Sequence, residues 1–193
     1  MKEKTVRYFS KPGKDNTNQV INAVKERVEE NDINYIVAPT STGKSALKLI
    51  NEIENKNLKI IVVGLHAGFR EGDNIPLPIN KQNEIKEKGA QVFIGSHSLS
   101  GIGRSISNKF GGITPTEIIA NTLRLFCGHG IKVAVEISIM AADAGLIPTN
   151  QNIIAIGGSH GGYDTAIVLK PAHMNNVFNI EIKEILAKPV SSN

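Results

Sequence analysis

The sequence predicts a three-layer α/β/α fold built on a mostly parallel sheet. Short apolar runs rich in β-branched residues alternate with segments of helical character along most of the chain. Glycine, asparagine or charged residues bound these runs, which is typical of parallel strands buried on both faces. The length of 193 residues is that of one α/β domain. We therefore expect a single doubly wound domain over residues 1–193.

The expected elements follow from these patterns in chain order. Residues 1–33 are expected to form a helical lead-in, in which Val20, Val24 and Val28 recur every four residues and give one apolar stripe. Thr114-Pro115-Thr116-Glu117 is the clearest helix start, because it combines a capping box with proline at the first helical position. The expected strands are residues 34–38, 58–64, 91–95, 131–137 and 152–157. The expected helices between them are residues 44–55, 79–89, 115–126 and 138–146.

The C-terminal part predicts antiparallel pairing. Residues 163–169 form a strand-like run that follows the 152–157 run after only a short glycine-rich turn. A parallel crossover needs a dozen or more residues, so we expect an antiparallel hairpin at the edge of the sheet. Residues 177–182 alternate in polarity and predict a further edge strand. Residues 163–186 are therefore expected to supply the C-terminal edge strands.

The turn Pro39-Thr40-Ser41-Thr42-Gly43-Lys44-Ser45 carries the clearest functional signal, because it joins an expected strand to an expected helix. The first N–H groups of a helix have no intrahelical partner, and the helix dipole adds positive charge there. A phosphate group fits such an end, where hydroxyls donate hydrogen bonds and Gly43 allows close approach. The alternative is an ordinary N-capped helix start. We predict phosphate contacts from Thr40, Ser41, Thr42, Gly43, Lys44 and Ser45.

The turn differs from the phosphate loop of ATPases. Gly-x-x-x-x-Gly-Lys-Ser/Thr requires glycine where Ala38 stands, so we expect no ATPase. The pattern Thr40-x-Thr42-Gly43-x-Ser45 instead resembles the flavodoxin loop Thr-x-Thr-Gly-x-Thr, which surrounds the phosphate of FMN. One serine replaces threonine, and Lys44 stands where flavodoxins usually have an uncharged polar residue. The resemblance makes FMN the first expected cofactor.

Two long segments, residues 66–78 and 96–113, are expected to be loops at the same rim of the sheet as this turn. They contribute His66, His97 and Arg104 as candidate ligand contacts, with an exposed loop arginine as the alternative for Arg104. The glycine-rich turn is expected to cover the ligand through Gly157, Gly158, Ser159, His160 and Gly161.

The rim histidines and Glu136 leave several interpretations open. His66, His97 and His160 each follow a different expected strand, and such a set is compatible with phosphate neutralisation, acid–base chemistry, a metal site or simple exposure. No metal is expected, and His129 receives no role. Glu136, at the end of the expected strand 131–137, is a candidate for contacting ligand hydroxyls or a ring N–H. Pairing with a nearby lysine is the alternative.

The glycine-rich turn also matches Gly-x-Ser-x-Gly, the nucleophile elbow of hydrolases. That motif requires a helix directly after its serine. The residues after Ser159 are instead expected to form a strand, so we expect no hydrolase.

The order of the expected elements resembles the C-terminal α/β domain of pyruvate kinase. Thr40 to Ser45 overlays the loop Thr-x-Ser-Gly-Arg-Ser of that family, and residues 153–169 repeat its strand, glycine-rich loop and strand. The resemblance spans about residues 15–172. It implies a regulatory domain, which in many members binds an allosteric sugar bisphosphate, so a sugar phosphate is the second expected ligand. A catalytic barrel has no room in this length, and pyruvate kinase activity is not expected.

Composition narrows the classes of protein to which this chain can belong. The net charge of +4 is spread over the chain and tryptophan is absent, so no nucleic-acid surface is expected. No apolar stretch approaches a membrane span and the polar start is not a signal peptide, while the lone Cys127 fits a reducing cytoplasm. The expected partner is a phosphorylated small molecule, and a homo-oligomer is compatible with the sequence. Two functions stay open: a binding or regulatory module, and an enzyme such as a flavin-dependent oxidoreductase.

Overall fold

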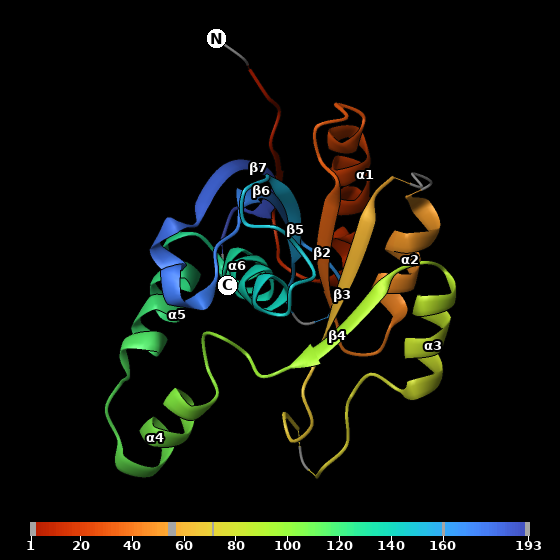
Figure 1. Cartoon of the computed structure of the whole chain (residues 1–193). Coiled ribbons are helices and arrows are strands. Elements are labelled where there is room, and N and C mark those ends of the chain that lie inside the picture. Colours follow the sequence, from red (N-terminus) through yellow and green to blue (C-terminus); the bar gives the residue numbers. More distant parts are fainter. Residues whose placement is uncertain (1–2, 54–56, 71, 160, 192–193) are drawn as a thin grey trace.

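The computed structural model describes residues 3–53, 57–70, 72–159 and 161–191, which form a seven-stranded sheet flanked by helices (Figure 1). The strands are β1 (Arg7–Phe9), β2 (Tyr35–Thr40), β3 (Lys59–Leu65), β4 (Gln91–Gly95), β5 (Ile153–Gly157), β6 (Thr165–Lys170) and β7 (Glu181–Pro189). The α-helices are α1 (Thr17–Val28), α2 (Lys44–Glu52), α3 (Ile79–Glu87), α4 (Ile102–Phe110), α5 (Pro115–Phe126) and α6 (His129–Asp143). Two 3-10 helices, η1 (Lys14–Asn16) and η2 (Met174–Asn179), complete these elements.

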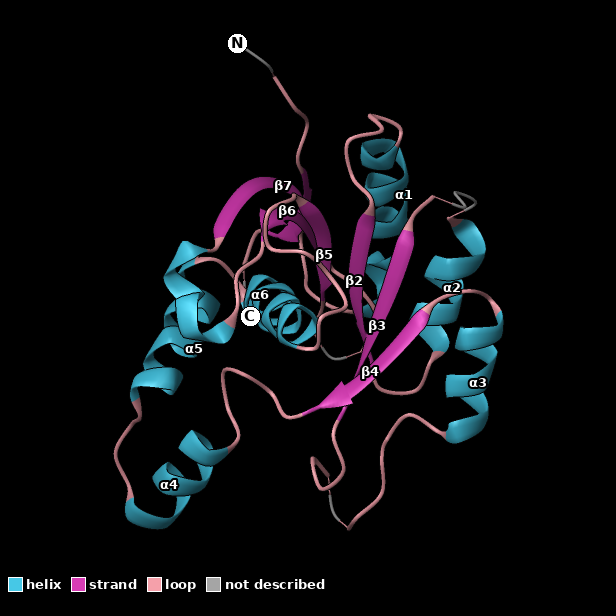
Figure 2. Ribbon diagram, viewed as in Figure 1, coloured by secondary structure: helices cyan, strands magenta, loops and turns pink. Residues whose placement is uncertain are grey.

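The helices cover both faces of the sheet, as the predicted three-layer class requires. Figure 2 shows α1, α2 and α3 on one side and α5 and α6 on the other. Side chains of the central strand β2 alternate between the two layers. Ile36 and Ala38 pack with α1 and α2, whereas Val37 packs with α6. The central strands are thus buried on both faces, which explains their continuous apolar runs.

The sheet order is β1-β7-β6-β5-β2-β3-β4, and the pairs β2/β3, β3/β4 and β2/β5 are parallel. The chain runs outward from β2 through β3 to β4 with α2 and α3 on one face. It then returns through α4, α5 and α6 to β5, beside β2. The direction of winding therefore reverses between β2 and β5. The carboxyl ends of strands at such a switch point are where open α/β sheets leave a crevice for a ligand.

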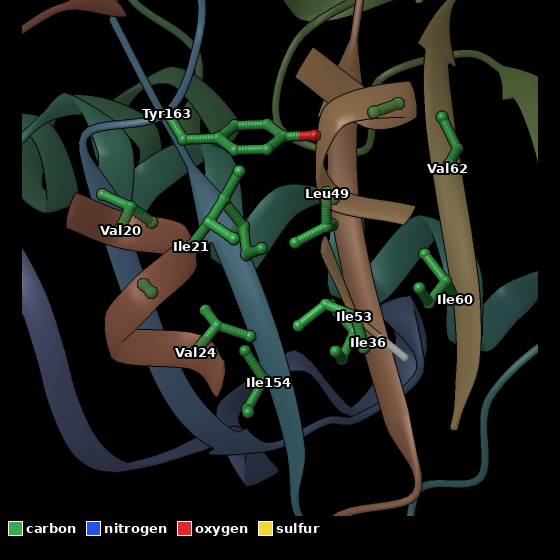
Figure 3. Packing of buried hydrophobic residues seen from close by; sticks show 14 of the residues in the cluster. Val20, Ile21, Val24, Ile36, Leu49, Ile53, Ile60, Val62, Ile154 and Tyr163 are labelled. Atoms are coloured by element: carbon green, nitrogen blue, oxygen red, sulfur yellow. The ribbon is translucent and has the colours of Figure 1, made fainter. Parts of the chain in front are cut away.

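Tyr163 links the glycine-rich turn to the core layer between α1, α2 and the sheet. Its side chain is fully buried, and Figure 3 shows the ring lying over Ile21 with the hydroxyl directed at the start of α2. The hydroxyl faces Ser45 in a contact too loose to count as an ordinary hydrogen bond. The turn after β5 is thereby positioned against the turn after β2.

The predicted strand at 131–137 is wrong, because these residues lie within helix α6. The predicted helix 138–146 is the continuation of the same helix, and Glu136 lies in its middle instead of at a strand end. Nearly every residue from 130 to 142 is buried, so the helix shows no polar face. Its apolar β-branched residues also recur every second position, which imitates a strand: Ile131, Val133, Val135, Ile137 and Ile139.

Four further expectations need correction. The segment 96–113 is not all loop, because it contains α4, none of whose residues is buried. The antiparallel pairing of β5 with β6 is confirmed, but the hairpin is not at the edge, since β7 and β1 lie outside it. Residues 177–179 belong to η2, and the following strand β7 runs on to Pro189. The lead-in contains β1, which pairs with β7 in parallel and closes this side of the sheet.

The capping box at Thr114 is confirmed, and α5 begins at Pro115. The Thr114 hydroxyl accepts from the Glu117 N–H at 3.4 Å, and the Glu117 carboxylate accepts from the Thr114 N–H at 2.9 Å. Local chemistry alone therefore fixes this helix start.

The first turn of α6 packs directly on the β5–β6 hairpin through two glycines. A Cβ placed on Gly157 would lie 1.9 Å from the carbonyl oxygen of Gly130, and a Cβ on Gly130 would lie 2.0 Å from Oγ1 of Thr165. Neither obstacle is the end of a flexible side chain, so the backbones must separate if either glycine is replaced. This contact brings the N-terminus of α6 to the rim of the sheet.

We expect Gly157→Ala to lower the free energy of unfolding by about 3 kcal/mol, because the added methyl group overpacks this contact. Urea denaturation measures the change. The control is Gly145→Ala, where φ is +70° and the space is open, so backbone strain of only about 1 kcal/mol is expected. Equal losses in the two variants would contradict the steric explanation.

Candidate functional site

A cavity of about 710 Å³ lies at the carboxyl ends of β2, β3 and β5, beside the switch point. The N-terminal turns of three helices contribute to its wall: Thr17 and Asn18 from α1, Lys44 and Ser45 from α2, and His129 from α6. The first N–H groups of each helix lack intrahelical partners, and each dipole places partial positive charge at that end. The fold therefore directs three helix N-termini at one space.

The turn after β2 has the conformation that its sequence predicts. Gly43 is the N-cap of α2 with φ of 89°, a left-handed conformation that a side chain would strain. Its N–H donates to Oγ1 of Thr40 at 3.0 Å, so this hydroxyl fixes the turn and can still donate its own proton. Ser41, Thr42, Lys44 and Ser45 surround the same cavity.

The charge of the cavity wall is strongly positive. Its described residues include six lysine and arginine side chains but only two carboxylates. The cations are Lys14, Lys44, Lys48, Arg104, Arg124 and Lys132, and the carboxylates are Asp15 and Glu136. Glu136 is moreover paired with Lys132. The wall thus favours an anion.

A buried carboxylate holds the glycine-rich turn beside this wall. Asp164 is fully buried, and its Oδ2 accepts from the N–H groups of Gly13 at 2.9 Å and Ser159 at 3.0 Å. Its Oδ1 accepts from the hydroxyl of Thr165 at 2.8 Å. The N-terminal segment, the turn after β5 and the start of β6 therefore meet at one side chain.

A second connection joins the same turn to α1. The N–H of Tyr163 donates to Oγ1 of Thr17 at 3.0 Å, and the Thr17 hydroxyl donates to the carbonyl of Lys14 at 2.6 Å. The first turn of α1 is thereby held at the cavity, with Thr17 and Lys14 in its wall.

An ion pair lines the cavity from α6. Nζ of Lys132 lies 2.6 Å from Oε2 of Glu136, and both side chains are at most 5% exposed. Oε1 of Glu136 accepts from the N–H of Leu99 at 3.0 Å, which holds the segment after β4 against α6. Burial lowers the pKa of Lys132, and the negative charge of Glu136 partly offsets this shift.

Three rings cluster beside the ion pair. His97 and Phe69 line the cavity with ring centroids 4.9 Å apart, and the ring of His66 lies 5.3 Å from that of His97. Burial lowers the pKa of His97, so its imidazole is neutral at pH 7. Its Nδ1 is buried and has no hydrogen-bond partner in the described part of the chain.

The structure brings most of the predicted site residues together. The predicted residues that line the cavity are Thr40, Ser41, Thr42, Lys44, Ser45, His97, Arg104, Gly158 and Gly161. The N–H of Gly43 is bound to Thr40, the ring of His66 packs edge-on against that of His97, and Gly157 packs on α6. Ser159 is buried against Asp164. His160 lies outside the described residues, so the predicted cluster of three histidines is described only in part.

Several cavity residues had no local signal in the sequence. Lys14, Lys48 and Arg124 come from separate helical segments, and only the fold places them at one wall. His129, for which the sequence suggested no role, also lines the cavity. For Lys132 and Glu136 a signal existed, since oppositely charged residues four apart are typical of a helix.

Two further features of the described residues concern metal binding and membrane spanning. No three histidine, cysteine, aspartate or glutamate side chains there are grouped so that they could hold a metal ion. None of the helices there combines the length and the hydropathy needed to cross a bilayer.

Fold and site together define an open α/β sheet protein with a cationic cavity at its switch point. The family model "Pyruvate kinase, alpha/beta domain" matches residues 18–169. The chain therefore belongs to this family, and the predicted resemblance is confirmed. The match covers α1 through β6, the elements that supply most of the cavity wall.

We expect Asp164→Asn to lower the free energy of unfolding by about 2 to 3 kcal/mol. Two N–H groups would exchange a charged acceptor for a neutral amide oxygen, and the amide NH2 would replace the oxygen that accepts from the Thr165 hydroxyl. Urea denaturation measures the change. The matched control is Asp143→Asn on the surface, where a change below about 0.5 kcal/mol is expected. A loss at Asp164 as small as at Asp143 would refute the anchoring role.

His97 predicts a pH dependence of stability with a definite sign. Its pKa is lower in the folded state, so the unfolded chain binds the proton more readily and stability falls as the pH drops through about 6.5. We expect His97→Gln to make the fall between pH 7 and pH 5 less steep in denaturant titrations. An unaltered slope in the His97 variant would contradict the assignment.

Proposed function

We propose that this chain binds a phosphorylated small molecule in the cavity at its switch point. FMN is the first candidate and a sugar phosphate the second. The observation that carries the proposal is the convergence of three helix N-termini with six cationic side chains on one cavity. Lys132 already has Glu136 as its counter-charge, and the positive charge that remains in excess favours a bound anion such as a phosphate group.

The phosphate is assigned to the turn after β2. There the free N–H groups of α2, the hydroxyls of Thr40, Thr42 and Ser45, and the ammonium of Lys44 surround one end of the cavity. Thr40 and Gly43 hold this turn rigid through their mutual hydrogen bond. A preorganised site of this kind loses little entropy on binding an anion.

FMN fits the remainder of the cavity better than a small sugar phosphate does. The volume of about 710 Å³ is in the usual range of sites for cofactors. Away from the turn, the wall combines the apolar side chains Val63, Leu65, Phe69, Val133 and Ile137 with charged and polar ones. A flavin ring has apolar faces and a polar edge, which suits this lining, and the Thr-x-Thr-Gly-x-Ser pattern adds to the case.

The alternative is an enzyme, either a flavin-dependent oxidoreductase or one acting on another phosphorylated metabolite. The buried and titratable groups at the cavity wall, His97, Lys132 and Glu136, favour this alternative. A regulatory module would need a ligand but no such groups.

The first experiment is an absorption spectrum of the purified protein before and after addition of FMN, with mass spectrometry of what heat releases. Retained or acquired flavin absorbance supports FMN. A colourless protein that takes up no FMN but is stabilised against unfolding by a sugar phosphate supports the second candidate. Absence of any stabilisation by FMN, sugar phosphates or inorganic phosphate would refute the proposal.

Thr42→Glu tests the role of the turn. Thr42 is exposed at the cavity, so the new carboxylate repels a phosphate across a partly screened gap and should weaken FMN binding at least about tenfold. Thr42→Gln is the matched control, because it has nearly the same shape without the charge. Quenching of FMN fluorescence gives both dissociation constants. Equal affinities for the two variants would remove the turn from the phosphate site.

A further inference from the structure

Helix α6 contributes an ion pair to the cavity wall. Binding of a phosphate at the turn after β2 does not explain why this pair is there. Lys132 and Glu136 form an ion pair there, although its surroundings include the apolar Val133 and Ile137. A buried ion pair costs desolvation energy that its attraction only partly returns. Such a pair is therefore weak evidence for stability, and its place in the cavity wall points to the ligand.

The two partners of the ion pair differ in their remaining capacity for hydrogen bonds. The carboxylate of Glu136 is satisfied, since Oε1 accepts from the N–H of Leu99 and Oε2 from Lys132. The ammonium of Lys132 has three N–H donors, and Glu136 is the hydrogen-bond partner of one of them within the described residues. Lys132 can thus donate further hydrogen bonds to a group that enters the cavity.

His97 supplies a second unsatisfied polar atom at the same wall. Its buried Nδ1 has no hydrogen-bond partner among the residues described, and the side chain lines the cavity. Lys132 and Glu136 line the same cavity as His97. A buried polar atom without a partner is costly, and because Nδ1 has almost no accessible surface, a ligand could bond to it only after the His97 ring turns toward the cavity.

The surroundings fix the kind of group that would satisfy these atoms. Phe69 packs against His97 at 4.9 Å between ring centroids, and Val63 and Leu65 line the cavity as well. A planar ring with apolar faces and several carbonyl and nitrogen atoms along one edge matches this combination. The pyrimidine edge of FMN has that chemistry.

We propose that Lys132 contacts the N1–C2 carbonyl edge of the flavin ring and makes the protein bind reduced FMN more tightly than oxidised FMN. This proposal rests on the proposed function. Reduction of FMN by two electrons and one proton gives an anion whose negative charge lies over N1 and the C2 carbonyl oxygen. Lys132 stabilises that charge, because charges beside N1 tune a flavin. Glu136 holds the ammonium in position, and His97 lines the same cavity.

The consequence is a raised reduction potential of the bound flavin. Linkage requires that a tenfold preference for the reduced form raise the potential by about 30 mV for a two-electron couple. We expect wild-type protein to bind reduced FMN at least about tenfold more tightly than oxidised FMN. Lys132→Met should lose most of this preference while retaining much of its affinity for oxidised FMN.

The test is an anaerobic redox titration of FMN-loaded protein with dithionite against a reference dye. Wild type is compared with Lys132→Met and with Lys132→Met/Glu136→Gln, in which the pair is removed as a whole and no unpaired charge is buried. Lys86→Met removes an exposed lysine from α3 and should leave the potential unchanged. Fluorescence quenching gives the affinities for oxidised FMN.

The outcomes separate the two proposals. If wild type binds FMN but its potential is at or below that of free FMN, the role of Lys132 is refuted and FMN binding stands. An equal potential in wild type and in a folded Lys132 variant refutes the role of Lys132 in the same way. If wild type binds no FMN, both the flavin assignment and the role of Lys132 fail.

Discussion

The buried carboxylate of Asp164 is the interaction on which the site depends. Gly13, Ser159 and Thr165 each donate to it, so it joins the N-terminal segment to the β5–β6 hairpin. Its cost of desolvation is high, and only the full set of donors offsets it. The turn after β5 is glycine-rich and would otherwise have many conformations. The carboxylate selects the one in which this turn closes the cavity.

Glycine residues at the rim of the sheet allow backbone segments to approach one another closely. Gly130 and Gly157 let the first turn of α6 touch the hairpin, and Gly43 permits the left-handed turn before α2. Helix N-termini reach the cavity only because side chains are absent at these points. The same residues therefore create both the packing of the rim and its positive potential. The glycines that the packing requires are thus the same ones that the proposed anion site requires.

The sequence predicted the part of the fold in which local pattern and tertiary environment agree. Strands β2 to β5 are apolar runs bounded by breakers, and Thr114 caps a helix by chemistry within four residues. Prediction failed at α6, since a helix buried on all sides loses its polar face and its β-branched residues imitated a strand. It failed at α4 because Gly101 and Gly103 suggested a loop, although Ile102, Ile106 and Phe110 recur at helical spacing.

The candidate site also has a part that the sequence predicted and a part that only the fold brings together. The turn from Thr40 to Ser45 is contiguous, so its chemistry was evident in the chain itself. Lys14, Lys48 and Arg124 are distant in sequence. They lie at one cavity wall only because of the order of the strands. Glu136 was a candidate from the sequence, and the alternative of pairing with a nearby lysine is the one that the structure shows, with Lys132 one helical turn away.

The balance between a binding module and an enzyme turns on the wall formed by α6. An anion site needs only the helix N-termini and the exposed cations, and these already exceed what one phosphate requires. The wall adds a buried ion pair and a neutral histidine with an unpartnered nitrogen among the described residues, which all cost free energy in the empty protein. The ion pair offsets part of this cost within the protein, and a ligand that accepts from Lys132 would offset more of it. Their presence argues that the cavity recognises the non-phosphate end of its ligand closely enough to influence its charge.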